Sequence, residues 1–139
     1  MINFYSFYNK TGLDKEEYSP LIDKLNDMTG YDIYTIELEP IKNIIKRIPE
    51  HAYWYARDVI KGRWREAEKY IIKDTRYAYF YAGRVIGGRW PEAEPYMMTD
   101  PHIAYRYATE VINGRWIEAE DIIMKSQYLW SVYCWGFSV

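Results

Sequence analysis

Apolar residues recur along most of this chain with a helical period, and that pattern itself returns every 26 residues. Between residues 52 and 60, apolar side chains fall at positions i, i+3, i+4, i+7 and i+8, which is one face of an α-helix. This stripe consists of Ala52, Tyr55, Ala56, Val59 and Ile60, and the same letters return at 78–86 and 104–112. The pattern predicts an amphipathic helix at the start of each repeat, at about 49–61 in the first.

A glycine, an arginine and a tryptophan follow each of these predicted helices. Gly62, Gly88 and Gly114 are expected to end the helices, because a residue beyond a helix C-terminus often has a positive φ, which costs glycine little. Trp64 and its equivalents are expected to fold back and fill the corner before the next helix.

A second, shorter helix is predicted to begin directly after the tryptophan, where Pro91 of the middle repeat suits the first turn. Its buried face is expected to consist of Ala67, Tyr70 and Ile71. The arginine of each Gly-Arg-Trp, such as Arg63, is expected to pair with a glutamate of its own or the next repeat.

Two short helices cannot bury a sufficient core alone, so neighbouring repeats must stack. The sequence therefore predicts a mainly α fold, specifically a short α-solenoid of tandem two-helix, 26-residue repeats. Full repeats are expected at about 49–74, 75–100 and 101–125, with a terminal half repeat at 126–139. Residues 39–48 resemble a degenerate second helix, so the predicted array spans 39–139.

The N-terminal segment, residues 1–38, lacks this period and is expected to cap the array. Residues 2–8 are rich in aromatic side chains and residues 31–38 alternate, as short strands do, with a helical pattern at 14–27 between them. The two candidate strands either pair as a small hairpin or belong to an all-helical segment.

Twelve of the 26 repeat positions are identical in all three full copies. They comprise the apolar stripe, one further tyrosine, the Gly-Arg-Trp turn and the Glu-Ala-Glu sequence. The main interpretation is that these residues are scaffold. The alternative is a repeated ligand site made by Arg63, Glu66 and Tyr53.

The positions that differ between copies form a second stripe on the first helix, opposite the packed one, which we call the variable stripe. It consists of Glu50/Arg76/His102, Trp54/Phe80/Arg106, Arg57/Gly83/Thr109, Asp58/Arg84/Glu110 and Lys61/Gly87/Asn113. Repeat proteins bind partners through such variable exposed side chains on a constant scaffold. The candidate partner-binding residues are Trp54, Arg57, Phe80, Arg84 and Arg106. Alternatively, these are unconstrained surface positions, or the N-terminal segment covers the two aromatic rings.

The last predicted helix repeats the packing stripe with bulkier groups, since Trp130, Tyr133, Cys134 and Phe137 occupy stripe positions. A solenoid end normally has a polar cap, whereas Trp130, Trp135 and Phe137 predict an apolar end here. Either these large side chains plug the end themselves, or they bury against a second copy in a homodimer.

Charge and composition limit the classes of function. The net charge is −2, and residues 49–125 contain twelve Lys or Arg and twelve Asp or Glu, so no strongly basic field for a polyanion is expected. The aromatic share of 19% nevertheless keeps an alternative open, in which stacked aromatics and arginines bind nucleic acid or a nucleotide.

No catalytic residue, metal ligand set or cofactor motif is predicted. His51 and His102 fall at different repeat positions and form no constellation with Ser or Asp. Cys134, the single cysteine, lies among aromatic residues as a core thiol does. The sequence predicts no signal peptide and no membrane span, and a cytoplasmic protein is expected.

The sequence Tyr-Ala-Arg-Asp-Val-Ile-Lys-Gly-Arg-Trp at 55–64, together with Pro-Glu-Ala-Glu-Pro at 91–95, resembles a short tandem repeat of proteins from large tailed phages and giant viruses. The resemblance covers residues 39–139. Only the middle repeat has the Pro-Glu-Ala-Glu-Pro form, because Arg65 and Ile117 replace the first proline elsewhere. The resemblance implies a viral accessory protein and supplies no catalytic residues. The leading hypothesis is a protein-binding module that engages or inhibits a host macromolecule.

Overall fold

The structure is a computed structural model that describes residues 42, 43 and 45–139. Over these residues the chain is mainly helical, as predicted. The predicted N-terminal cap at 1–38, with its hairpin, lies outside the described residues. Ile45 is buried, as is Ile71 one period later, which agrees with a degenerate helix before the first full repeat.

Each repeat contributes one longer helix, whose last turn is a π-helix, and one shorter helix. The longer helices are α5 (Pro49–Tyr55) with η1 (Ala56–Ile60), α7 (Thr75–Tyr81) with η2 (Ala82–Ile86), α9 (Pro101–Arg106) with η3 (Tyr107–Ile112), and α11 (Gln127–Phe137). The shorter ones are α6 (Arg65–Ile71), α8 (Glu94–Met97) and α10 (Glu120–Ile123), the last preceded by the 3₁₀ turn η4 (Ile117–Ala119).

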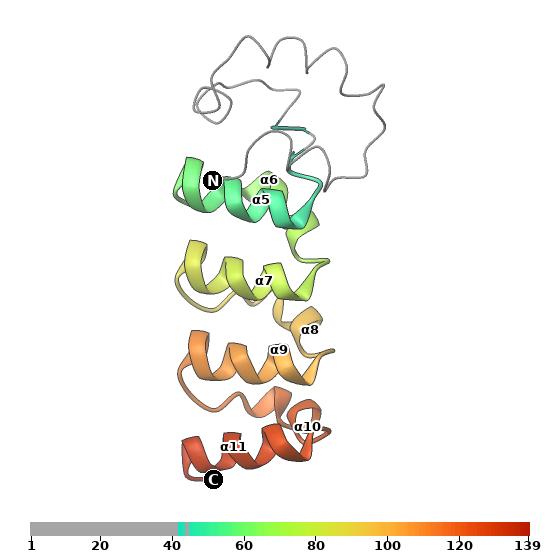
Figure 1. The fold of residues 1–139 in the computed structure, drawn as a ribbon, viewed down its shortest axis with the longest axis vertical. Coiled ribbons are helices and arrows are strands. Elements are labelled where there is room, and N and C mark those ends of the chain that lie inside the picture. Colours follow the sequence, from blue (N-terminus) through green and yellow to red (C-terminus); the bar gives the residue numbers. More distant parts are fainter. Residues whose placement is uncertain (1–41, 44) are drawn as a thin grey trace.

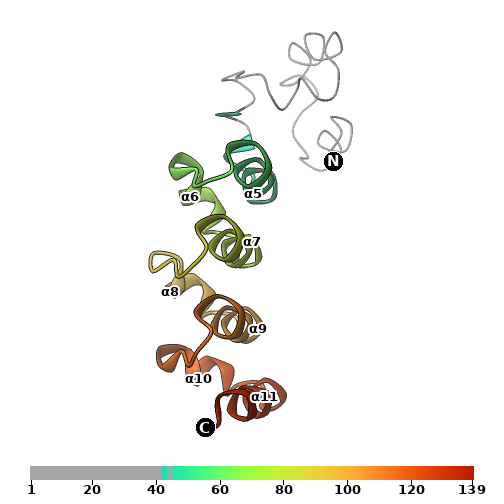
Figure 2. The same ribbon diagram turned by 90° about the vertical axis from the view of Figure 1, so that its left-hand side faces the viewer.

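The longer helices lie one above another in a single column, from α5 to α11 (Figure 1). The shorter helices α6, α8 and α10 follow one side of that column (Figure 2). The core lies between successive layers, where the two alanines of each longer helix are fully buried: Ala52, Ala56, Ala78, Ala82, Ala104 and Ala108. Small side chains at these positions let neighbouring helices approach closely.

Three of the longer helices, α7, α9 and α11, begin at side-chain caps that the sequence specifies. The carboxylate of Asp100 accepts hydrogen bonds from the backbone N–H groups of His102 (2.9 Å) and Ile103 (3.4 Å), and Pro101 occupies the first turn. Asp74 caps α7 and Ser126 caps α11 in the same way. Each cap satisfies N–H groups that have no partner within the helix.

The expected left-handed residues lie one position earlier than predicted. Gly62, Gly88 and Gly114 have no φ in the left-handed region, which is occupied instead by Lys61 (58°), Gly87 (80°) and Asn113 (58°). The reason is the wide π turn, which the sequence pattern did not indicate. In it the carbonyl of Ala82 accepts from the N–H groups of both Gly87 (2.9 Å) and Gly88 (3.1 Å). Nothing in the structure explains why position 62 and its equivalents are glycine.

The tryptophans fill the corners as predicted. The ring of Trp90 lies 5.0 Å from that of Tyr81 on the preceding helix of its own repeat, and Trp116 lies 4.9 Å from Tyr107. Both indoles are almost fully buried. Trp64 makes the equivalent contact with Tyr55 at 5.0 Å and is half-buried.

The shorter helices bury fewer residues than predicted. Ala67 and Ile71 are fully buried, as are their equivalents Ala93, Met97, Ala119 and Ile123. Tyr70, however, is only half-buried, and Tyr96 at the same position is 48% exposed. A four-residue helix such as α8 has room for only one buried edge, so the tyrosine position turns towards solvent.

The left-handed turn gives a direct test of this backbone geometry. Gly87→Ala should lower the free energy of unfolding by about 1 kcal/mol, because a Cβ is unfavourable at a φ of 80°. Urea denaturation measures the change. The matched control is Gly88→Ala, where an added Cβ meets no atom within 4 Å and φ lies outside the left-handed region. Equal effects at the two positions would contradict the assignment.

Candidate functional site

Arg63 and Glu68 form an ion pair that recurs in each repeat, built from side chains identical in every copy. Arg63 donates through Nε to Glu68 Oε2 (3.1 Å) and through a terminal nitrogen to Oε1 (2.5 Å). The pairs Arg89–Glu94 and Arg115–Glu120 have the same arrangement. The arginine therefore pairs within its own repeat, which is one of the two predicted alternatives.

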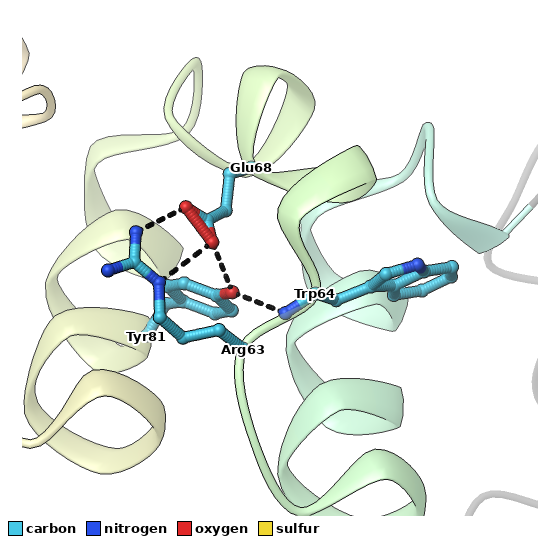
Figure 3. Close-up of polar contacts among 4 residues, drawn as sticks. All are labelled: Arg63, Trp64, Glu68 and Tyr81. Atoms are coloured by element: carbon cyan, nitrogen blue, oxygen red, sulfur yellow. Dashed lines mark hydrogen bonds and ion pairs between the residues drawn. The ribbon is translucent and has the colours of Figure 1, made fainter.

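A tyrosine from the next repeat lies at each ion pair: Tyr81 and Tyr133 bond both the glutamate and a backbone N–H, whereas the Tyr107 hydroxyl accepts from the Trp90 N–H (2.7 Å). Figure 3 shows the first of the three. The Tyr81 hydroxyl donates to Glu68 Oε2 (2.9 Å) and accepts from the backbone N–H of Trp64 (2.8 Å). Tyr133 makes the same two bonds, to Glu120 (3.0 Å) and from Trp116 (2.8 Å). We call this group of arginine, glutamate, tryptophan N–H and next-repeat tyrosine the repeat junction.

Burial sets the electrostatics of the junction. Tyr81, Tyr107 and Tyr133 are fully buried, and loss of solvent raises the pKa of each phenol, to about 12 for Tyr107. The hydrogen bonds that Arg63 donates to Glu68 raise the pKa of Arg63 above its ordinary value. The charged arginine and the neutral phenol are therefore the stable forms at neutral pH.

The junction gives four of the twelve identical positions a scaffold role, and it differs from the alternative ligand site of Arg63, Glu66 and Tyr53. Glu68, not Glu66, contacts the arginine, while Glu66 is exposed. Tyr53 is 1% exposed, and its hydroxyl is bonded instead by Arg84 of the next repeat (3.4 Å). The structure does not bring the three residues of that alternative site together.

The variable stripe, in contrast, places arginines over aromatic rings. The guanidinium of Arg57 lies 5.0 Å from the centre of the Trp54 ring, and that of Arg84 lies 5.1 Å from the centre of Phe80. Both rings are half-buried and both arginines are exposed. Such cation–π contacts are attractive and hold a long side chain in one region of the surface.

The rows of the stripe are joined across repeats by tyrosines that the sequence analysis assigned to the scaffold. Tyr53 of the first repeat packs against Phe80 of the second at 5.9 Å between ring centres. Arg106 of the third repeat lies over Tyr79 of the second at 5.0 Å. Four of the five predicted residues, those of the first two repeats, therefore share one surface, and Arg106 extends it to the third. The 26-residue spacing of these tyrosines was the pattern that could have indicated their place beneath the stripe.

Arg84 is the arginine of this surface with the least neutralised charge. Arg57 lies 3.6 Å from Asp58 and Arg106 lies 3.6 Å from Glu110, as exposed ion pairs. Arg84 has no ion pair with an acidic residue in the described part of the chain, and its bonding partner is a neutral phenol. Arg84 can therefore bind a carboxylate of another molecule without first breaking an ion pair with an acidic residue among the described ones.

The three residues of the predicted apolar end separate into two groups. Trp130 stacks on Tyr133 at 5.4 Å and Phe137 contacts the other side of that tyrosine at 4.9 Å, so both are half-buried. Trp135 is 87% exposed. By the 26-residue count it occupies the position of Arg57, so it belongs to the variable stripe. The structure separates it from Trp130 and Phe137, because neighbours in sequence point to different sides of a helix.

The two histidines and the cysteine considered in the sequence analysis lie on three different helices. His51 is buried in α5, His102 is exposed on α9, and Cys134 is half-buried. In residues 42, 43 and 45–139, no three His, Cys, Asp or Glu side chains are grouped closely enough to hold a metal ion. Over the same residues, no helix has both the length and the apolar character to cross a membrane.

Comparison of the chain with protein-family models, with curated proteins and with solved structures found no match. The resemblance to viral tandem repeats therefore stays a prediction, and the functional argument depends on the variable stripe.

The repeat junction predicts a measurable loss of stability on removal of one hydroxyl. Tyr81→Phe should lower the free energy of unfolding by about 1–3 kcal/mol, because the Trp64 N–H and Glu68 each lose a partner in a buried site. Tyr79→Phe on the same helix is the control, since its hydroxyl makes no hydrogen bond within the described residues. Denaturation curves of equal midpoint for the two variants would refute the role of the junction.

The raised pKa of Tyr107 predicts alkaline sensitivity. Between the unfolded pKa of about 10 and the folded value of about 12, the folded chain holds the proton more tightly, so stability falls as pH rises through this window. Below pH 10 the contribution is fully present. Urea unfolding should show a decrease from pH 9 to pH 11 that is about 1 kcal/mol smaller in Tyr107→Phe than in the wild type. An identical decrease in both would show that Tyr107 does not titrate in this way.

Proposed function

We propose that this chain is a protein-binding module, a short α-solenoid of two-helix repeats that binds its partner through the variable stripe. The support for the solenoid is the repeat junction, which joins each repeat to the next through the same four groups. The support for binding is that the identical positions and the variable positions have different surroundings. The identical residues hold the repeats together, and the variable ones form a surface.

The observation that carries the proposal is the ordered row of arginines on half-buried rings. Trp54 and Phe80 provide apolar area in the first two rows of the surface, and the exposed side chains of Arg57 and Arg84 lie over them. Trp and Arg are among the residue types that dominate binding energy in protein interfaces. Because the rings already restrict the arginines, less side-chain freedom is lost when a partner binds.

The alternative, nucleic-acid binding, has weaker support from the same geometry. Bases bind such surfaces by stacking on open aromatic faces. Here guanidinium groups lie over the rings of Trp54 and Phe80, so a base would have to displace an arginine to stack. Asp58 and Glu110 beside the arginines would also oppose a phosphate backbone.

From the resemblance to viral repeat proteins we further propose that the partner is a host protein and that binding takes place in the host cytoplasm. This part of the proposal depends on that resemblance alone. The binding surface itself does not, because it follows from the contacts of the stripe.

Capture of partners from a host-cell lysate tests the proposal. The Trp54→Ala/Phe80→Ala variant should lose one specific protein that the wild type retains, with affinity reduced at least about tenfold. Arg57→Ala/Arg84→Ala, which leaves the rings in place, should weaken the binding of the same protein. Tyr96→Ala removes an exposed ring from α8, outside the stripe, and should retain that protein.

Equal helicity of all variants by circular dichroism is the control for folding. Retention of the same partner by both stripe variants would reject the stripe as the binding site. Partners that disappear after nuclease treatment, with binding that weakens steeply as salt rises, would favour the nucleic-acid alternative instead.

A further inference from the structure

The variable stripe continues onto α11, where its character changes. Counted by the 26-residue period, the stripe positions of this helix are Tyr128, Val132, Trp135, Gly136 and Val139. Tyr128 is 74% and Trp135 87% exposed, and Val139 is also exposed. Residues 126–139 contain no charged side chain. The last row of the stripe is therefore apolar, and its two largest rings have most of their surface in solvent.

The side chains of the stripe change from row to row in such a way that one copy is complementary to a second copy running in the opposite direction. From the first row to the fourth, the position of Trp54 carries Trp, Phe80, Arg106 and Val132. The position of Asp58 carries Asp, Arg84, Glu110 and Gly136. Read in opposite directions, the two central rows therefore place a ring opposite an arginine and an arginine opposite a glutamate.

We propose that the variable stripe binds a second copy of this chain in a two-fold dimer in which the stack of one copy runs opposite to that of the other. The two-fold axis lies in the contact plane, parallel to the longer helices, so α7 faces α9 of the partner subunit. Two-fold contacts are reciprocal, so every pairing occurs twice.

Charge complementarity in the central rows supports this arrangement. Arg84, which has no acidic partner among the described residues, faces Glu110 of the partner subunit. Phe80 faces Arg106 of the partner subunit. Within one chain, Arg106 and Glu110 form an ion pair at 3.6 Å with about half of each side chain exposed, and such pairs contribute little to stability. Glu110 can therefore give up its ion pair with Arg106 at small cost and neutralise Arg84 of the partner subunit.

The outer rows supply the apolar part of the contact. Val132 faces Trp54 of the partner subunit, and Trp135 faces Arg57 of the partner subunit. Trp135 then loses an exposed ring face to a guanidinium, and Trp54 is covered on its solvent side. Because α11 is uncharged, every ion in this part of the interface comes from the row of α5, where Arg57 and Asp58 already pair at 3.6 Å.

The dimer goes beyond the proposed function and uses the same surface, so a second copy and another protein partner would compete. It also uses a different surface from the predicted self-association through the C-terminal end. Of Trp130, Trp135 and Phe137, only Trp135 lies in the proposed interface, since the other two pack around Tyr133.

Sedimentation equilibrium of the full chain, over concentrations up to about 1 mM, tests the dimer and its register. The wild type should dimerise. Arg84→Glu and Glu110→Arg should each weaken dimerisation about tenfold or more, because each places like charges opposite one another. The double variant Arg84→Glu/Glu110→Arg restores opposite charges in the same chain and should dimerise as the wild type does. Trp135→Ala should also weaken the dimer by about tenfold.

Arg65→Glu makes the same charge change on the exposed side of α6, outside the stripe, and should leave the dimer intact. A wild type that stays monomeric over the whole range would overturn the proposal. So would a dimer that tolerates Arg84→Glu, or one that the double reversal fails to restore. None of these outcomes affects the lysate experiment, which reports a different protein and is run on dilute chain, so the two proposals can fail separately.

Discussion

The hydroxyl of one buried tyrosine per repeat is the contact on which the rest of the stack depends. At Tyr81 and Tyr133 it lies between a carboxylate and a backbone N–H of the preceding repeat, and the packing around them shields both groups from most of the solvent. An unsatisfied N–H or carboxylate in such a place costs more than the hydrogen bond itself contributes. The hydroxyl reaches both groups only when the next repeat has one position and one orientation. The tyrosine thus selects that arrangement among the ways in which the apolar faces could stack.

Much of the helical architecture could be predicted because its determinants are local. The 3.6-residue period, the caps at Asp74 and Asp100, and the corner tryptophans all depend on residues within one repeat. The π turns were not predictable in this way, since the letters from Ala82 to Gly88 fit an ordinary helix end equally well. That extra residue in the turn moved the left-handed position to Lys61, Gly87 and Asn113.

The candidate site was predictable in part for a related reason. Comparison of the copies identified Trp54, Arg57, Phe80, Arg84 and Arg106 as variable, and the structure places them on exposed helix faces. Their contacts with Tyr53 and Tyr79 depend on how two repeats meet, which periodicity within one helix does not describe. Trp135 was grouped by its apolar character, whereas its repeat position gives the correct face.

The repeat junction has a consequence for how such a chain can change in evolution. Every junction uses the same types of group at the same spacing, so removal or duplication of 26 residues would join surfaces that already match. Chain length can then vary in whole units by recombination, without the need for a new hydrophobic interface. The order of the variable rows would change with each such event, and with it the set of molecules to which the surface is complementary.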